Sequence, residues 1–264
     1  MLLRLNPPLC SRLVRPFVSP ALLLAVLCAD LGFAQTTYYV NGVTGNTCHD
    51  GLAPVPSDLC IPGSPPPTIP GPFRTITAAV LAAATPATGF PVTILVAGAT
   101  SGGSPVVYDA ALGESFPISV PQDTVIRYDA ANSTPGTLVT VDAAGTGAPW
   151  VFAFQASPAN PFSSAGGLDG STLGSGTQAI RVRGADVGVR IAATGDGAVN
   201  SITVRNVRIW NNVTRSAHVL ADQGTPNPAF ASPTFDSCLF TQEMGVVPVL
   251  TDHLLLEARA DGRR

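Results

Sequence analysis

Short runs of β-forming residues, separated by segments rich in Gly, Pro and Asn, are the main pattern along this chain. Residues 36–40 are Thr-Thr-Tyr-Tyr-Val, a composition typical of a strand, and residues 41–72 are rich in turn formers and are predicted as a loop. Further short strands are predicted at 91–97, 118–120, 124–128, 138–141 and 150–154. Many short strands joined by turn residues predict an all-β protein.

Two segments have helical rather than alternating spacing. In residues 73–84, Phe73, Ile76 and Val80 lie at helical spacing and most of the remaining positions are Ala, which predicts a helix. The segment 249–260 is predicted as a second helix, because it begins with N-cap residues and is followed by Gly.

Three segments near the C-terminus repeat one order of apolar and polar residues. Residues 179–188 align with the start of 201–212 at an offset of 22, and 201–212 align with 232–243 at an offset of 31. Each unit consists of two short strands around a bend. The bend residue is Gly184 in the first unit and Asn206 in the second, and both residue types accept a positive φ.

The alternation within the second unit places apolar side chains on one side of both strands. The inward set is Ile202, Val204, Val207 and Ile209, and the outward set is Thr203, Arg205, Arg208 and Trp210. So small a unit cannot bury its apolar side alone, and stacking of successive units in one column solves this problem. The prediction is a right-handed parallel β-helix whose first coil is capped by the 73–84 helix. A β-sandwich is the alternative, and it does not require equivalent strands to keep the same inward phase.

The N-terminus has the pattern of a secretory signal peptide. Three arginines (Arg4, Arg12, Arg15) precede an apolar run from Phe17 to Leu27, and small residues then mark a cleavage site after Ala34. The alternative is a signal anchor that stays attached. Export implies an extracellular, periplasmic or cell-surface location.

These features divide the chain into four parts. They are a signal peptide (1–34), a strand with a Pro-rich loop (35–72), a capping helix with the β-helix (73–244), and a C-terminal segment that fits the repeat poorly (245–264).

Composition narrows the function classes. Of 264 residues, 26 are Gly and 25 are Pro, only 12% are charged, and the net charge is -3 with no Lys. Frequent Gly and Pro exclude a coiled coil, and 45% hydrophobic content excludes a disordered chain. The acidic balance argues against nucleic-acid binding. No apolar run after the signal peptide is long enough to span a bilayer.

The cysteines and acidic residues predict a disulfide and no cofactor. Export to an oxidising compartment favours a Cys48–Cys60 disulfide across the Pro-rich loop. Residues 48–50, Cys-His-Asp, could serve as metal ligands, but no second pair at zinc-like spacing accompanies them. Asp-Gly pairs at 169–170 and 196–197 lack the repeated acidic spacing of calcium loops, so turn chemistry explains them better than Ca²⁺.

Several segments resemble one family of secreted bacterial proteins. The segments are Tyr39-Val40-Asn41-Gly42, Gly71-Pro72-Phe73-Arg74-Thr75-Ile76, Thr93-Ile94-Leu95-Val96 and Gly113-Glu114-Ser115-Phe116-Pro117. Together they are similar to an uncharacterised, domain-of-unknown-function branch of the pectin-lyase-like right-handed parallel β-helix superfamily. The resemblance implies the fold and no particular reaction. The Asp-Asp pair and Gly-His of polygalacturonases are missing from this chain, which argues against that activity.

Stacking of the repeat units predicts outward columns with neighbours about 4.8 Å apart. The predicted columns are Arg183–Arg205–Asp236, Asp186–Arg208–Leu239 and Gly188–Trp210–Thr241. Arginine binds carboxylates through two hydrogen bonds, and an exposed aromatic face stacks on sugars. Arg183, Arg205, Arg208 and Trp210 are therefore predicted to bind an acidic polysaccharide or a cell-surface glycan. The alternative is a surface charge ladder without a ligand.

A longer connection, residues 213–231, contains the candidates for catalysis. His218 and Asp222 could act as acid and base if both met a sugar, but His218 also fits a strand with its side chain facing outward. Three functions follow in order of preference. They are a β-helix module that binds glycans or presents a surface without catalysis, a polysaccharide lyase or glycoside hydrolase of unfamiliar type, and a structural piece of a larger surface protein.

Overall fold

The chain divides into two units, Met1–Phe33 and Ala34–Arg264. The computed structural model describes residues 35–56, 69–84, 91–99, 105–156, 166–172, 177–195, 198–199, 201–223, 230–231, 233–242 and 252–259. The predicted signal peptide, residues 1–34, lies outside the described residues, so its cleavage stays a prediction.

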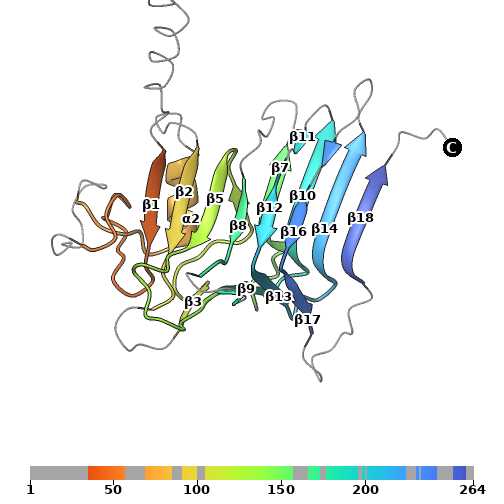
Figure 1. Cartoon of the computed structure of the whole chain (residues 1–264). Coiled ribbons are helices and arrows are strands. Elements are labelled where there is room, and N and C mark those ends of the chain that lie inside the picture. Colours follow the sequence, from red (N-terminus) through yellow and green to blue (C-terminus); the bar gives the residue numbers. More distant parts are fainter. Residues whose placement is uncertain are drawn as a thin grey trace, which may run out of the picture. The chain divides into compact units, whose positions relative to one another are not determined.

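Three parallel sheets form the second unit (Figure 1). Sheet I contains β1 (Thr36–Val40), β2 (Val92–Val96), β5 (Thr124–Tyr128), β8 (Gly167–Asp169), β12 (Thr203–Arg205) and β16 (Thr234–Asp236). Sheet II contains β3 (Val106–Asp109), β6 (Val139–Asp142), β9 (Ile180–Arg183), β13 (Val207–Trp210) and β17 (Leu239–Thr241). Sheet III contains β4 (Ile118–Val120), β7 (Trp150–Ala156), β10 (Val187–Gly195), β14 (Arg215–Gln223) and β18 (Asp252–Arg259). A separate pair joins β11 (Ala198–Val199) to β15 (Phe230–Ala231).

Each coil runs from sheet I to sheet II to sheet III, and the next coil begins again in sheet I. The fold is therefore the predicted right-handed parallel β-helix, and the β-sandwich alternative is wrong because every sheet pairs its strands in parallel. Residues with a positive φ occupy all three corners. They are Asp123 and Ser201 before sheet I, Asn206 and Ser237 between sheets I and II, and Gly184 and Asn211 between sheets II and III.

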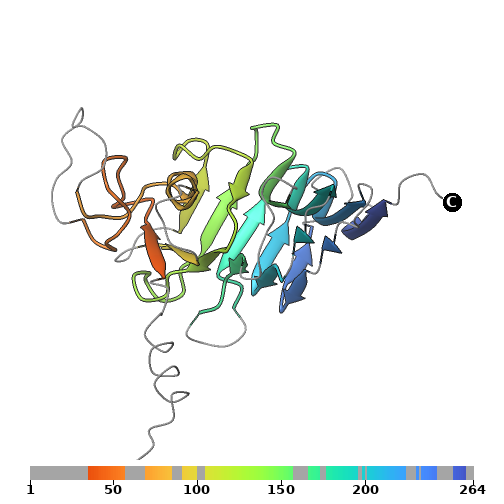
Figure 2. The same ribbon diagram turned by 90° about the horizontal axis from the view of Figure 1, so that it is seen from above.

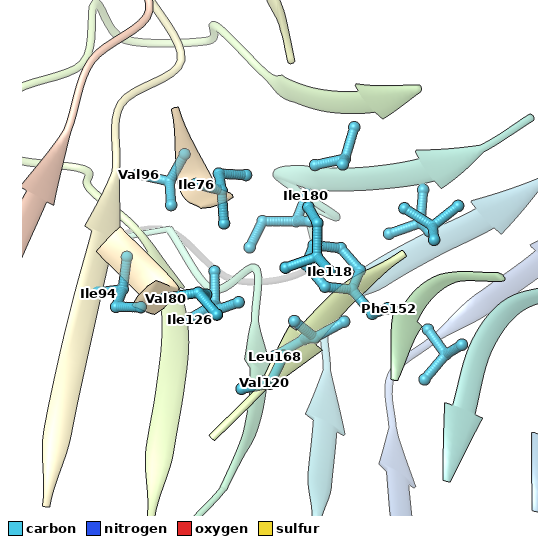
Figure 3. Close-up of a cluster of buried hydrophobic side chains, with 14 of the residues drawn as sticks. Ile76, Val80, Ile94, Val96, Ile118, Val120, Ile126, Phe152, Leu168 and Ile180 are labelled. Carbon is cyan, nitrogen blue, oxygen red and sulfur yellow. The ribbon is translucent and has the colours of Figure 1, made fainter. Parts of the chain in front are cut away.

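The interior of the helix is a column of apolar side chains (Figure 3). The predicted inward residues Ile202, Val204, Val207 and Ile209 are all fully buried. The largest fully buried side chains include Tyr108, Phe152, Phe154, Ile94, Ile118, Ile126, Leu168 and Ile180. Strand alternation around each corner thus places one face of every sheet in the common core.

Helix α2 (Ile76–Ala83) packs against β1, β2 and β4 at the first coil, as predicted (Figure 2). The helix is shorter than the predicted 73–84, because Thr75 is its N-cap. Its N-terminus also meets the buried carboxylate of Glu114, which accepts hydrogen bonds from the backbone N–H of Ile76 and from the N–H and hydroxyl of Thr77. Burial raises the pKa of Glu114 despite these bonds.

Most of the predicted strands are confirmed, but β3, β8 and the pair β11 and β15 were not predicted, and β14 lies in the segment expected as a long connection. The predicted C-terminal helix is wrong. Residues 252–259 form strand β18, which pairs in parallel with β14. Leu254 and Leu256 lie beside the buried Ala217 and Val219, so pairing with the preceding coil decides the conformation over the local pattern.

The two repeat offsets have different outcomes. The offset of 31 is confirmed, because Thr203 pairs with Thr234 and Arg208 pairs with Leu239. The offset of 22 is wrong, because Ile180 pairs with Val207. The segment 179–188 crosses the corner between sheets II and III, whereas 201–210 crosses the corner between sheets I and II. Both corners have strands around a residue with positive φ, so their sequence patterns look alike.

The cysteines agree with an oxidised N-terminal loop. Cys48 is disulfide-bonded. Cys60 lies outside the described residues, so the Cys48–Cys60 pairing stays a prediction. Cys238 is a free, half-buried thiol that packs against the core, and burial raises its pKa. Among the described residues, the structure has no helix that is both long and apolar enough to cross a membrane.

Candidate functional site

The outer face of sheet I carries a column of alternating charges. Strand register places Arg127, Asp169, Arg205 and Asp236 beside one another, in that order. Arg127 Nε lies 3.1 Å from an Asp169 carboxylate oxygen, and Arg205 Nε lies 3.0 Å from an Asp236 oxygen. Arg205 therefore has the predicted neighbour Asp236, but its other neighbour is Asp169 and not Arg183. The charge-ladder alternative describes this column.

A shallow hollow of about 250 Å³ lies beside this column on sheet I. Its lining residues are Val125, Arg127, Gly166, Leu168, Asp169, Ser201, Thr203 and Arg205. The backbones of β8 and β12 approach closely here, since a Cβ added at Gly167 would lie 1.9 Å from the Thr203 carbonyl oxygen. This close approach of the two backbones requires glycine at position 167.

The outer face of sheet II carries arginines as direct neighbours. Arg181 pairs in register with Arg208, and no ion pair to either is found among the described residues. Arg183 instead has a carboxylate partner, since its guanidinium lies 2.7 Å from an oxygen of Asp142. Arg208 Nε donates to the Thr241 hydroxyl at 3.1 Å.

Trp210 lies among these arginines, and the expectation that its ring is exposed is wrong. Its exposed fraction is 8%. The guanidinium carbons of Arg183 and Arg208 lie 4.9 and 4.8 Å from its ring centroid, which are cation–π distances. The ring packs against guanidinium groups, so little of it remains for stacking on a sugar. We call Arg181, Arg183, Arg208 and Trp210 the arginine cluster.

Arg181 is not one of the binding residues that the sequence analysis predicts. Burial, followed by repulsion from Arg208 and Arg183, lowers its pKa. The alternation Arg-Val-Arg at 181–183 shows that Arg181 faces outward with Arg183. Its neighbour across the sheet could not be identified with the wrong repeat offset.

The two catalytic candidates lie on the same strand of sheet III. His218 and Asp222 are four residues apart on β14, which separates their Cα atoms by about 13 Å. His218 Nε2 instead lies 3.2 Å from a carboxylate oxygen of Glu257, on the neighbouring strand β18. The side chain of Asp222 lies outside the described residues.

Arg190 is the neighbour of His218 on the other side. The two residues are in register on β10 and β14, and the Arg190 guanidinium lies 4.2 Å from the Trp150 ring centroid. Histidine, a carboxylate and an arginine thus lie close together on the outer face of sheet III. Sequence spacing could not have shown this, because Glu257 belongs to the segment predicted as a helix.

The residues that the sequence analysis considered and set aside as metal ligands make other contacts. Cys48 is in a disulfide, and His49 is buried with its Nδ1 3.0 Å from the Pro72 carbonyl oxygen. The Asp169 carboxylate accepts from Arg127 and from the backbone N–H of Ser171, which is the turn chemistry expected of its Asp-Gly pair. The pair at 196–197 lies outside the described residues.

Comparison with known proteins identifies a family without a described reaction. No curated protein and no solved structure matches the chain. The model of the family described as "Protein of unknown function (DUF1565)" matches residues 63–212, which is more than half of the chain. The chain therefore belongs to this family, whose fold is a parallel β-helix.

Proposed function

We propose that this protein is an exported β-helix module that binds glycans on the outside of its sheets and does not cleave them. The main observation behind this proposal is the hollow on sheet I, which Gly166 helps to line, beside the ladder Arg127–Asp169–Arg205–Asp236. Sugar hydroxyls both donate and accept hydrogen bonds, and this column alternates donors with acceptors. The resemblance to the pectin-lyase-like superfamily adds to the case for a carbohydrate ligand.

The size and lining of the hollow favour one sugar unit of a longer glycan. Its volume of about 250 Å³ is below the roughly 300–1,000 Å³ of enclosed small-molecule pockets. Val125 offers an apolar patch for the C–H groups of a sugar ring, while Arg205 and Thr203 offer hydrogen bonds at the rim. A flat, open site of this kind suits a polymer that crosses several strands.

A glycan array with the mature chain, starting at Gln35, tests this function. We expect retention of at least one polysaccharide class, and about a fivefold or greater loss of binding for Arg205→Ala. Arg74→Ala is the matched control, because Arg74 is an exposed arginine that lies outside the strands of the three sheets and does not line the hollow. Absence of binding to any glycan would contradict the proposal and favour a structural piece of a larger surface protein.

Cleavage of an acidic polysaccharide is the second candidate function. It is favoured by the His218–Glu257 contact of 3.2 Å beside Arg190, since a histidine oriented by a carboxylate is a common proton acceptor. An assay for new reducing ends or unsaturated products decides the matter. If the wild-type chain cleaves the polysaccharide and His218→Ala does not, the protein is a lyase or hydrolase, and the proposal of binding without cleavage is wrong.

A further inference from the structure

The arginine cluster contains two buried donors without an acceptor. Nε of Arg181 and Nε1 of Trp210 have no hydrogen-bond partner among the described residues. Both groups donate and cannot accept. Buried donors in folded proteins almost always have an acceptor, which is a protein group, a water or a ligand, and the described residues supply none for these two.

The charges of the cluster indicate the kind of acceptor. Within the part of the chain that the structure describes, Asp142 is the one carboxylate paired with these arginines, and it neutralises Arg183. Arg181 and Arg208 remain as adjacent cations on strands about 4.8 Å apart. Like charges opposite each other on a sheet destabilise it. An anion between them would remove this repulsion.

Trp210 holds these cations in place. Its ring lies under the guanidinium groups of both Arg183 and Arg208, and the Asp142 and Thr241 contacts fix the same two side chains further. Arginine heads that are already ordered lose less conformational freedom when a ligand binds. The cluster is thus arranged before any anion arrives.

We propose that the arginine cluster is an oxyanion-binding site. A carboxylate or sulfate group accepts hydrogen bonds from Arg181 Nε, from the Arg208 guanidinium and from Trp210 Nε1. The proposal deepens the proposed function, on which it rests for the view that the oxyanion belongs to a glycan. Free inorganic anions share this chemistry, and the experiment separates the two sources.

The test is calorimetric titration of the mature chain with sodium sulfate, sodium glucuronate, and sulfated or uronate oligosaccharides at fixed ionic strength. We expect Arg181→Gln to weaken oxyanion binding tenfold or more, because it removes a charged donor. Trp210→Phe keeps an aromatic ring but removes Nε1–H, and we expect a several-fold loss. Arg208→Gln repeats the test with the Trp210 ring unchanged.

Arg74→Gln is the matched control, because it removes one arginine charge from an exposed position outside the strands of the three sheets. It should leave oxyanion affinity within about twofold of wild type, since screened surface charges act weakly at a distance. Equal affinity in wild type and Arg181→Gln, or no oxyanion binding at all, would overturn the proposal.

The outcomes separate this proposal from the glycan-binding function. Glycan retention that depends on Arg205 but not on Arg181, with no response to sulfate, would reject the oxyanion site and keep the glycan function. Binding of free sulfate through Arg181 with no glycan retained would confirm the site and reject its glycan source. Tighter binding of acidic oligosaccharides than of the free anions would support both.

Discussion

The outer faces of sheets I and II have the same strand spacing and opposite charge patterns. On sheet I, Arg127, Asp169, Arg205 and Asp236 alternate in sign, so each charge has an opposite neighbour. On sheet II, Arg181 and Arg208 are neighbours of like sign. A parallel β-helix repeats every outward position at about 4.8 Å, so the order of signs decides whether a column neutralises itself or requires a counterion.

The strongest test of this comparison is to give sheet I the pattern of sheet II. Asp169→Arg would place three arginines in consecutive strands and remove an acceptor from the N–H of Ser171. We expect a loss of about 2 kcal/mol in the free energy of unfolding, measured by urea denaturation. Asp169→Asn keeps the turn acceptor and should lose about 1 kcal/mol or less. Equal losses in the two variants would mean that charge order is unimportant.

Glu114 contrasts with both outer columns, because it is a buried carboxyl group that accepts hydrogen bonds from the neutral groups of Ile76 and Thr77. Glu114→Gln removes an acceptor from the N-terminus of α2, and we expect a loss of about 1–2 kcal/mol. Because burial raises its folded pKa above the usual 4.5, the contribution of Glu114 is fully present below about pH 4.5 and falls as the pH rises through the folded pKa. Unfolding free energies from pH 4 to 8 should therefore show the gap between wild type and variant narrowing as the pH rises. A gap that widens would contradict the raised pKa.

The smallest effect is expected when sheet II is given the pattern of sheet I. Arg208→Glu places opposite charges beside each other at the Arg181 position, and we expect a gain of about 0.5 kcal/mol in low salt. The gain should shrink in high salt, because exposed charges are screened. Arg208→Gln should give about half of the gain in the free energy of unfolding. Equal stability of wild type, Arg208→Glu and Arg208→Gln would show that the two arginines do not repel each other.

Local pattern was sufficient for much of the fold. Alternation in Ile202, Val204, Val207 and Ile209 identified the buried side of two strands, and the residue Asn206 identified the corner between them. The helical spacing of apolar residues in the segment 73–84 likewise identified α2. These features depend on neighbours in sequence, which the sequence displays directly.

The composition of the candidate sites depended on pairing between distant strands. The separation along the chain between a residue and its partner in the next coil is 27 residues at Ile180–Val207, 31 residues at Thr203–Thr234 and 37 residues at Arg215–Asp252. Connections of different length cause this variation, so no single offset predicts the columns. The wrong offset hid Arg181 and Asp169, and the wrong helix hid Glu257.

By itself the sequence determined the alternation of buried and exposed positions, the corners and the cap. Tertiary structure alone decided which outward residues are neighbours, and therefore that Arg205 meets aspartates on sheet I while Arg208 meets Arg181 on sheet II. The physical reason is that side-chain phase follows from the geometry of one strand, whereas register follows from hydrogen bonds between strands of successive coils.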